Sequence, residues 1–269
     1  MLPGAGALRL ARAWRAHLHA AADCPPQRRR VPLAWRGERI GSVEADLFDR
    51  AALAGSPLLR WRDVQGTWDV VGELTSSLAR IAFVLRDRGL AHAWRDEQLA
   101  VRNDAGAVLA TVERAVVRPL GIATHAVHLV ATDARGGHWV QQRAFDKPTD
   151  PGLWDTLMGG MVPARDSLED ALARETWEEA GLQLAQVRDL RYGGRLLTRR
   201  PFRELPHGYV VEALDWYACT LPEGVQPANQ DGEVAGFRCM PPAEVEMLLE
   251  REAFTIDASL ILAAAYGDS

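Results

Sequence analysis

The pattern of hydrophobic and polar residues predicts a small α+β domain in the first part of the chain. Apolar residues recur at helical spacing in two segments, and two pairs of short β-rich runs are typical of hairpins. In the second helical segment Thr75 is the expected N-cap and Gly89 the expected end. The expected helices and hairpins cover residues 8–22, 74–90, 31–43 and 100–117. Pro119 lies at the expected boundary of this domain, residues 1–118.

The pattern then changes, because longer apolar strands alternate with helices from Gly121 onward. Ser167 and Asp170 have the spacing of a capping box, and Gly181 is the expected stop of the helix that they begin. This alternation predicts a second, α/β domain over residues 119–269. Strands are expected at residues 122–132, 138–143, 153–158, 186–197, 209–220 and 234–239, and helices at 167–180, 242–251 and 257–265.

The helix at 167–180 has an apolar stripe that becomes acidic. At about 100° per residue, Glu175, Glu178 and Glu179 fall in the same arc as the apolar positions. Carboxylates at this spacing repel one another unless a cation or protonation relieves them. One interpretation is a solvated helix end, with Arg174 paired to Glu178. The other is a site for Mg²⁺ or Mn²⁺, which prefer carboxylate oxygens. A turn at Gly159-Gly160, leading from a strand, would leave backbone groups free near the acids.

Composition and charge exclude several classes of protein. The 269 residues carry a net charge of −5 with a pI of about 5.8, unlike a general nucleic-acid binder. The apolar runs are shorter than the ~20 residues that span a bilayer. Three widely spaced cysteines argue for a reducing compartment, so we expect a cytoplasmic protein without nucleic-acid or membrane partners. The basic segment before residue 22 superficially suits a presequence, but its helical periodicity favours a packed helix.

The residues around the acidic helix resemble the Nudix box. The box reads Gly, five residues, an acid, seven residues, Arg-Glu, an apolar residue, any residue, Glu-Glu, any residue, Gly and an apolar residue. Two positions depart from it: Asp166 replaces a glutamate that usually braces the box arginine, and Thr176 replaces an aliphatic residue. Weaker bracing of Arg174 is therefore expected. The matching residues are Gly160, Arg174, Glu175, Glu178, Glu179, Gly181 and Leu182.

The resemblance implies an α/β/α sandwich around a mixed sheet, preceded here by the small α+β domain. It implies Mg²⁺ or Mn²⁺ bound by Glu175, Glu178 and Glu179, with the carbonyl of Gly159 or Gly160 as a further ligand. The implied reaction is attack of water on a diphosphate linked to a second moiety. The chemistry is consistent, because a metal ion neutralises charge on the diphosphate and lowers the pKa of water, so one clustered glutamate can help to deprotonate it.

Looser similarities extend over nearly the whole chain. The segments 151–155, 231–234 and 237–241, together with the first domain, resemble a Nudix subgroup that carries an N-terminal domain of unassigned function. Its relatives include the Nudix portion attached to fungal thiamine pyrophosphokinase. That resemblance implies hydrolysis of thiamine diphosphate analogues to the monophosphate. Glu233 is a candidate metal ligand or base, or else a charged turn residue.

The substrate, a small-molecule diphosphate, needs cations and an apolar surface. Lys147 is the only lysine beside thirty arginines, and its compact charge next to the box suits a phosphate. Arg143 and Arg195 are further candidate phosphate ligands, and Trp154 is a candidate to stack a heterocycle. Each of these residues could equally be an ordinary surface or core residue.

Isomerisation of a diphosphate and ligand binding without catalysis are the two alternatives to hydrolysis. Isomerisation of an isoprenoid diphosphate would need a cysteine before the box, and Cys24, Cys219 and Cys239 are not placed there. A degenerate Nudix module that binds a nucleotide-like ligand as a sensor or scaffold stays open, because of Asp166 and Thr176. A homodimer also stays open. In each case the first domain could close over the ligand.

Overall fold

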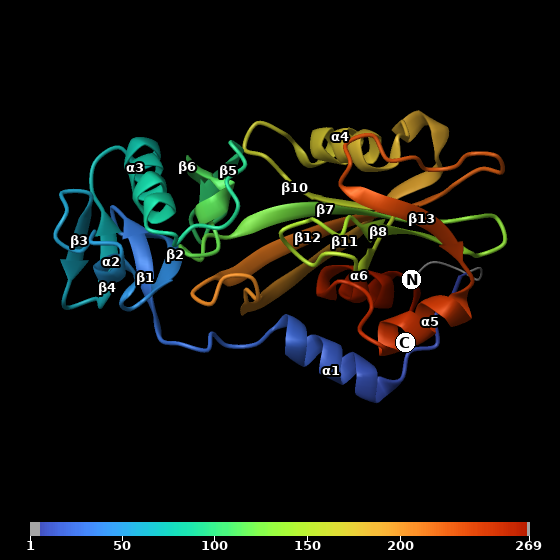
Figure 1. Cartoon of the computed structure of the whole chain (residues 1–269), viewed down its shortest axis with the longest axis horizontal. Coiled ribbons are helices and arrows are strands. Elements are labelled where there is room, and N and C mark those ends of the chain that lie inside the picture. The colour runs from blue at the N-terminus through green and yellow to red at the C-terminus, as the bar shows by residue number, and fades with distance from the viewer. Residues whose placement is uncertain (1–5, 268–269) are drawn as a thin grey trace.

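The first half of the chain folds around a four-stranded sheet with order β2-β1-β4-β3, in which only β1 and β4 are parallel. The computed structural model describes residues 6–267, and Figure 1 shows this sheet at one end of the molecule with α3 beside it. The hairpin β5–β6 lies between the sheet and the second half. The elements are β1 (Arg30–Trp35), β2 (Glu38–Glu44), α2 (Leu47–Arg50), β3 (Leu59–Arg62), β4 (Thr67–Val70), α3 (Leu74–Asp87), β5 (Gln98–Arg102), β6 (Val108–Glu113) and η1 (Arg114–Val116).

Helix α3 confirms the predicted periodicity but begins differently. The N-cap is Glu73, not Thr75, and its carboxylate accepts hydrogen bonds from the backbone N–H groups of Thr75 and Ser76. A glutamate side chain is long enough to reach these free donors, so Glu73 caps the helix in place of the expected threonine hydroxyl. Gly89 follows the helix with φ +67°, as expected for a residue that ends it.

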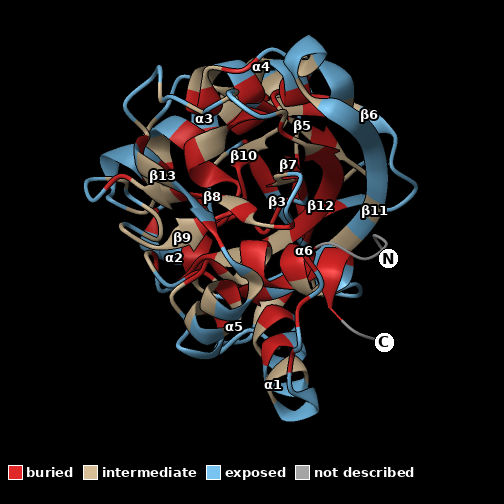
Figure 2. Ribbon diagram, turned by 90° about the vertical axis from the view of Figure 1, so that its right-hand side faces the viewer, coloured by how far each residue is buried: buried red, intermediate tan, exposed pale blue. Residues whose placement is uncertain are grey.

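The second half is built on a mixed seven-stranded sheet with the path β11-β12-β7-β8-β13. Strand β12 runs parallel to β7, and the other pairs are antiparallel. The strands are β7 (Thr124–Thr132), β8 (His138–Arg143), β9 (Trp154–Asp155), β10 (Met158–Met161), β11 (Arg188–Pro201), β12 (Tyr209–Thr220) and β13 (Val234–Met240). Strand β11 forms an edge, and much of it is exposed in Figure 2.

Helices cover both faces of this sheet, which confirms the predicted α/β/α sandwich. The alternation along β7 sends Leu129 toward the core beneath α4 and Val130 toward the core shared with α5 and α6. Figure 1 shows α4 on one side of the sheet and α1, α5 and α6 on the other. The helices are α1 (Arg12–Ala22), α4 (Leu168–Ala180), η2 (Leu184–Gln186), α5 (Pro242–Glu250) and α6 (Ile256–Tyr266).

The single strand expected at 153–158 is wrong, because the segment divides into two strands. Trp154 and Asp155 pair with β8, whereas Met158 begins the pairing with β7. Between the two, the Thr156 hydroxyl donates to the Met158 carbonyl over 2.7 Å and stabilises the change of direction. The predicted turn at Gly159-Gly160 is also wrong, since both glycines lie inside β10.

The packing of α1 differs from the expected domain division. Leu18 and Ala22 of α1 belong to the core of the C-terminal half, whereas the core of the first sheet continues to Leu120 and Ile122. The division into 1–118 and 119–269 stays a prediction, and its ends, 1–5 and 268–269, lie outside the described residues. Below, "N-terminal module" means residues 30–122, and "Nudix body" means 123–267 with α1.

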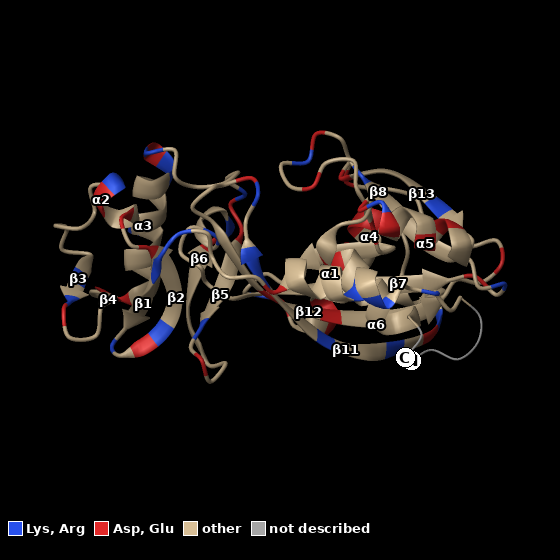
Figure 3. Ribbon diagram, turned by 90° about the horizontal axis from the view of Figure 1, so that it is seen from below, with Lys and Arg blue, Asp and Glu red and all other residues tan. Residues whose placement is uncertain are grey.

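Within residues 6–267, none of the helices combines the length and the apolar character required to span a bilayer. Figure 3 shows acidic and basic positions interspersed over the described part of both halves.

Candidate active site

Helix α4 begins and ends as the sequence predicts. The Ser167 hydroxyl accepts from the Asp170 backbone N–H, and the Asp170 carboxylate accepts from the Ser167 backbone N–H, which completes the capping box. Gly181 takes the left-handed conformation with φ +64°. Thr176 is fully buried, and its hydroxyl donates to the Leu172 carbonyl over 2.6 Å. That bond satisfies the hydroxyl, so threonine is tolerated where the box prefers an aliphatic residue.

The three box glutamates face the protein to different extents. Glu179 is 2% exposed, whereas the side chains of Glu175 and Glu178 are 13% and 42% exposed. Burial is the largest cause of the raised pKa of Glu175, which reaches about 8; Glu179 and Glu178 add to the rise, and Arg174 opposes it. Burial also raises the pKa of Glu179. The interpretation as a wholly solvated helix end is therefore wrong for Glu175 and Glu179, while Glu178 lies at the rim.

Arg174 connects the acids of the box. Its guanidinium donates to Asp166 at 2.9 Å, to Glu175 at 3.0 Å and to Glu178 at 2.8 Å. Asp166 therefore braces this arginine although its side chain is one carbon shorter than the usual glutamate, and the expected weakening is not seen. Atom Nη2 of Arg174 is buried without a hydrogen-bond partner. Arg174 orients two of the three box carboxylates.

The two glycines of β10 bring backbone next to the carboxylates. The Gly159 N–H donates to Glu179 over 3.0 Å. A Cβ atom on Gly160 would overlap the Glu175 carboxylate, so the absence of a side chain lets that carboxylate lie against the strand. The two glycines thus allow the backbone of strand β10 to lie close to the carboxylates, and they do not form a turn.

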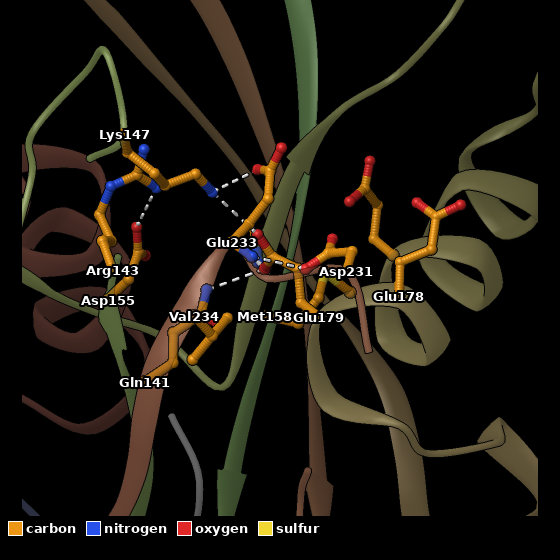
Figure 4. A network of polar contacts seen from close by, with 12 residues as sticks. Gln141, Arg143, Lys147, Asp155, Met158, Glu178, Glu179, Asp231, Glu233 and Val234 are labelled. Atoms are coloured by element: carbon orange, nitrogen blue, oxygen red, sulfur yellow. Dashed lines mark hydrogen bonds and ion pairs between the residues drawn. The ribbon is translucent and has the colours of Figure 1, made fainter. Parts of the chain in front are cut away.

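Lys147 lies between two carboxylates. Its ammonium is 3.4 Å from Glu179 and 2.5 Å from Glu233, and its side chain is only 9% exposed. Glu179 also accepts from the Gln141 amide at 2.8 Å. Figure 4 shows Lys147 reaching both acids from one side, with Glu178 on the helix opposite. Burial opposes ionisation of Glu233, but Lys147, Arg95 and Arg114 outweigh it and lower the pKa of Glu233.

Of the other three predicted substrate ligands, one lines the cavity and two do not. Arg143 lines the cavity, but its guanidinium donates to the carbonyls of Thr149 and Asp150 and pairs with Asp155, so it braces the loop that carries Lys147. Trp154 does not line the cavity; it packs against the core shared with α6. Arg195 lies outside it too, paired with Asp215 at 3.0 Å beside a second cavity.

The acids open onto a cavity of about 240 Å³ that both halves of the chain line. The sequence indicated that the first domain could close over the ligand, but it did not identify the residues that line the cavity, because they are far from the box in sequence and follow no periodic pattern. Two buried ion pairs line the same cavity, Arg118 with Glu212 at 2.9 Å and Arg200 with Asp257 at 3.4 Å. The residues of the module that line it are His92, Ala93, Arg95, Glu97, Arg114, Val117 and Arg118.

The donor set suits a hard divalent cation. Glu179 is buried and Glu175 is largely buried, both acids have raised pKa values, and the space above Gly160 is filled by a carboxylate. Among the described residues, no three carboxylate, histidine or cysteine side chains already converge on one point. Arg174 pairs with Glu175 and Glu178, and Lys147 with Glu179. The chemistry of the residues fits Mg²⁺ or Mn²⁺, with these two cations as the present counter-charges. Cys24, Cys219 and Cys239 do not line the cavity.

Comparison with known proteins agrees with the box. Residues 123–262 match the family model described as the NUDIX domain, which is more than half of the chain, and the chain therefore belongs to the Nudix family. It is 30% identical over 184 residues to Nudix hydrolase 20, chloroplastic, and 28% identical over 195 residues to Nudix hydrolase 24, chloroplastic, both from Arabidopsis thaliana. These matches cover 67% and 71% of this chain.

The chain spans about half the length of these two relatives, 48% and 53%. A crystal structure of DR0079 from Deinococcus radiodurans shares the fold, with a TM-score of 0.51 and 18% identity. That likeness covers 63% of this chain and 99% of the other.

Proposed function

We propose that this protein is a metal-dependent diphosphohydrolase that splits a diphosphate linkage and releases a monophosphate. The observation that carries the proposal is the set of three box glutamates, with Glu179 buried and the Glu175 side chain only 13% exposed, opening onto a cavity that also holds Lys147. Charged groups are rarely buried without a functional or structural partner. Membership of the Nudix family and the names of the two plant hydrolases support the same reaction class.

The metal would be held by Glu175, Glu178 and Glu179, with a carbonyl of Gly159 or Gly160, and would supply charge neutralisation and activation of water. Arg174 keeps Glu175 and Glu178 oriented. One carboxylate of this set accepts the proton of the attacking water. Mg²⁺ or Mn²⁺ is the proposed ion, since oxygen donors suit both.

Residues around the acids supply the remaining functions. The Gln141 amide and the Gly159 N–H fix Glu179, so one of its oxygens is held while the ammonium of Lys147 lies close to the other. Lys147 provides a compact positive charge for a phosphate oxygen. Glu233 contacts the Lys147 ammonium at 2.5 Å, and its carboxylate can act as a base or as a further ligand.

The substrate class is a nucleoside-diphosphate-like or thiamine-diphosphate-like small molecule. The thiamine alternative is supported by the resemblance to the subgroup related to fungal thiamine pyrophosphokinase. The cavity of about 240 Å³ is smaller than the ~300–1,000 Å³ of typical ligand pockets and is suited to a small moiety. Cytoplasmic location stays a prediction, and so does the absence of nucleic-acid partners.

The test is phosphate release from thiamine diphosphate analogues, ADP-ribose and nucleotide sugars, with and without Mg²⁺. We expect Glu178→Gln and Glu179→Gln to lower turnover by at least about 10–100-fold, the loss typical of changes around a metal ligand. Glu169→Gln, an exposed position on the same helix, is the matched control and should retain activity. Undiminished turnover in both ligand variants would refute the proposal.

A ligand-binding sensor or scaffold is the second candidate. It is favoured by one observation, that Arg174 and Lys147 already neutralise the acids. Thermal stabilisation by one of these diphosphates, without turnover under any metal, would support the sensor and exclude the enzyme.

A further inference from the structure

One loop of the N-terminal module reaches the cavity and carries a guanidinium that has few partners. Residues 88–97 connect α3 to β5, and Arg95 of this loop lines the cavity with Lys147 and Glu233. Within residues 6–267, the only ion pair of Arg95 is with Glu233, at 3.6 Å, and its guanidinium makes no hydrogen bond. A guanidinium has five N–H donors. Those of Arg95 are therefore available to a ligand.

The loop is held firmly, so the position of Arg95 is built into the fold. The Arg95 backbone N–H donates to Glu113 at 3.0 Å. The Trp94 ring stacks on Phe83 with centroids 5.4 Å apart, and Arg86 lies over the same ring. Trp94 also donates through Nε1 to Asp96 at 2.7 Å. These contacts fix the loop on both sides of Arg95. The loop therefore loses little conformational entropy when the Arg95 side chain binds a ligand in the cavity.

Two loops, one from each half of the chain, meet at this point. His92 contacts the Thr149 hydroxyl at 3.2 Å, and Thr149 belongs to the loop that carries Lys147. Glu233 lies between the two cations, 2.5 Å from Lys147 and 3.6 Å from Arg95. Its carboxylate is a single negative group held by one cation from each half. A phosphate group presents more oxygens and more charge than a carboxylate to the same two cations.

We propose that Arg95 and Lys147 form a phosphate subsite shared by the two halves of the chain, and that the Glu233 carboxylate occupies this subsite until the substrate phosphate displaces it. The proposal rests on the function proposed above and specifies how that site recognises its substrate. The N-terminal module then contributes directly to substrate binding. Arg95 is a binding residue, and Glu233 competes with the phosphate in the resting protein.

The experiment measures binding of inorganic pyrophosphate by calorimetry in the presence of EDTA, so that neither turnover nor metal binding is required. Arg95→Gln should weaken binding about tenfold or more, as expected when a charge-assisted hydrogen bond to the anion is lost. Arg95→Lys keeps a positive charge and should recover much of the affinity. Glu233→Gln removes the competing charge and should tighten binding several-fold. Arg80→Gln, at an exposed position of α3, is the matched control and should bind as the wild type does.

The proposal is overturned if wild type and Glu233→Gln both fail to bind pyrophosphate, if Arg95→Gln behaves like Arg80→Gln, or if Glu233→Gln weakens binding. The Arg95→Lys variant and the melting temperatures of all variants show whether a loss reflects misfolding. If the variants bind pyrophosphate as expected but no diphosphate is hydrolysed with Mg²⁺, the phosphate subsite is supported and the proposed hydrolase activity is refuted. If hydrolysis occurs but the variants do not bind pyrophosphate as expected, the hydrolase activity is supported and the phosphate subsite is refuted.

Discussion

Replacing Glu175 with glutamine should change how the stability of the metal-free protein depends on pH. Burial, reinforced by Glu179, raises the pKa of Glu175 to about 8, against an ordinary value of 4.5. Between these two values the unfolded chain loses the proton while the folded protein keeps it. The free energy of unfolding therefore falls as the pH rises from about 4.5 and levels off above about 8. Glu175→Gln has no proton to lose and should lack this fall.

The shift is worth on the order of 4–5 kcal/mol at most, at about 1.4 kcal/mol per pH unit. Glutamine still occupies the space against Gly160, but Arg174 loses a charged partner in the variant. We therefore expect Glu175→Gln to be more stable than wild type by about 2–4 kcal/mol at pH 8.5, and by little at pH 5.

The assay is urea unfolding in EDTA at several values of pH from 5 to 8.5. Buried and half-buried histidines have lowered pKa values and contribute the opposite trend, so the difference between wild type and variant isolates Glu175. Glu169→Gln on the same helix controls for loss of one negative charge. Adding Mg²⁺ at pH 8.5 should stabilise wild type more than Glu175→Gln. Parallel pH curves for wild type and Glu175→Gln would show that the reasoning about this carboxylate is wrong.

Two further substitutions test the packing around the cavity. Gly160→Ala should lower Mg²⁺ affinity and melting temperature, because its Cβ would overlap the Glu175 carboxylate; Gly236→Ala, which has open space, should change neither, and equal effects would contradict the argument. Arg118→Met should cost about 3–5 kcal/mol in urea unfolding at neutral pH, because it leaves Glu212 buried without its partner at 2.9 Å. A loss below about 1 kcal/mol would show that this pair is not needed.

Local rules predicted the acidic helix well, because its features lie within a few turns of one another. The Ser167 cap, the Gly181 stop and the inward direction of Glu175 and Glu179 all follow from spacing along a single helix. The spacing from Gly160 to the acids could be recognised as a Nudix box because these residues are also close together in sequence. What the spacing could not show is that Gly160 belongs to a strand, because β10 exists only through its pairing with β7.

Residues whose partners are distant in sequence were harder to place. Arg195 lies directly opposite Asp215 in the β11–β12 register, and this cross-strand acid holds its guanidinium away from the cavity. Trp154 lies in a strand of two residues, which is too short for an alternating pattern to show the face of the sheet on which its side chain lies. Arg95 lies in a segment that resembles the Nudix subgroup, but no spacing or periodicity indicates its role, because it meets Glu233 only after two halves of the chain pack together. Sequence periodicity reports on one element and not on the contacts between elements.

The central claim is that the box glutamates hold a divalent cation, and Mn²⁺ titration followed by electron paramagnetic resonance tests it most directly. We predict saturable binding of Mn²⁺ to the wild-type protein, lost or weakened by at least about 10–100-fold in the double variant Glu178→Gln, Glu179→Gln, while Glu169→Gln binds normally. Mn²⁺ binding of equal affinity in the wild type and the double variant, or no binding to the wild type at all, would contradict the account.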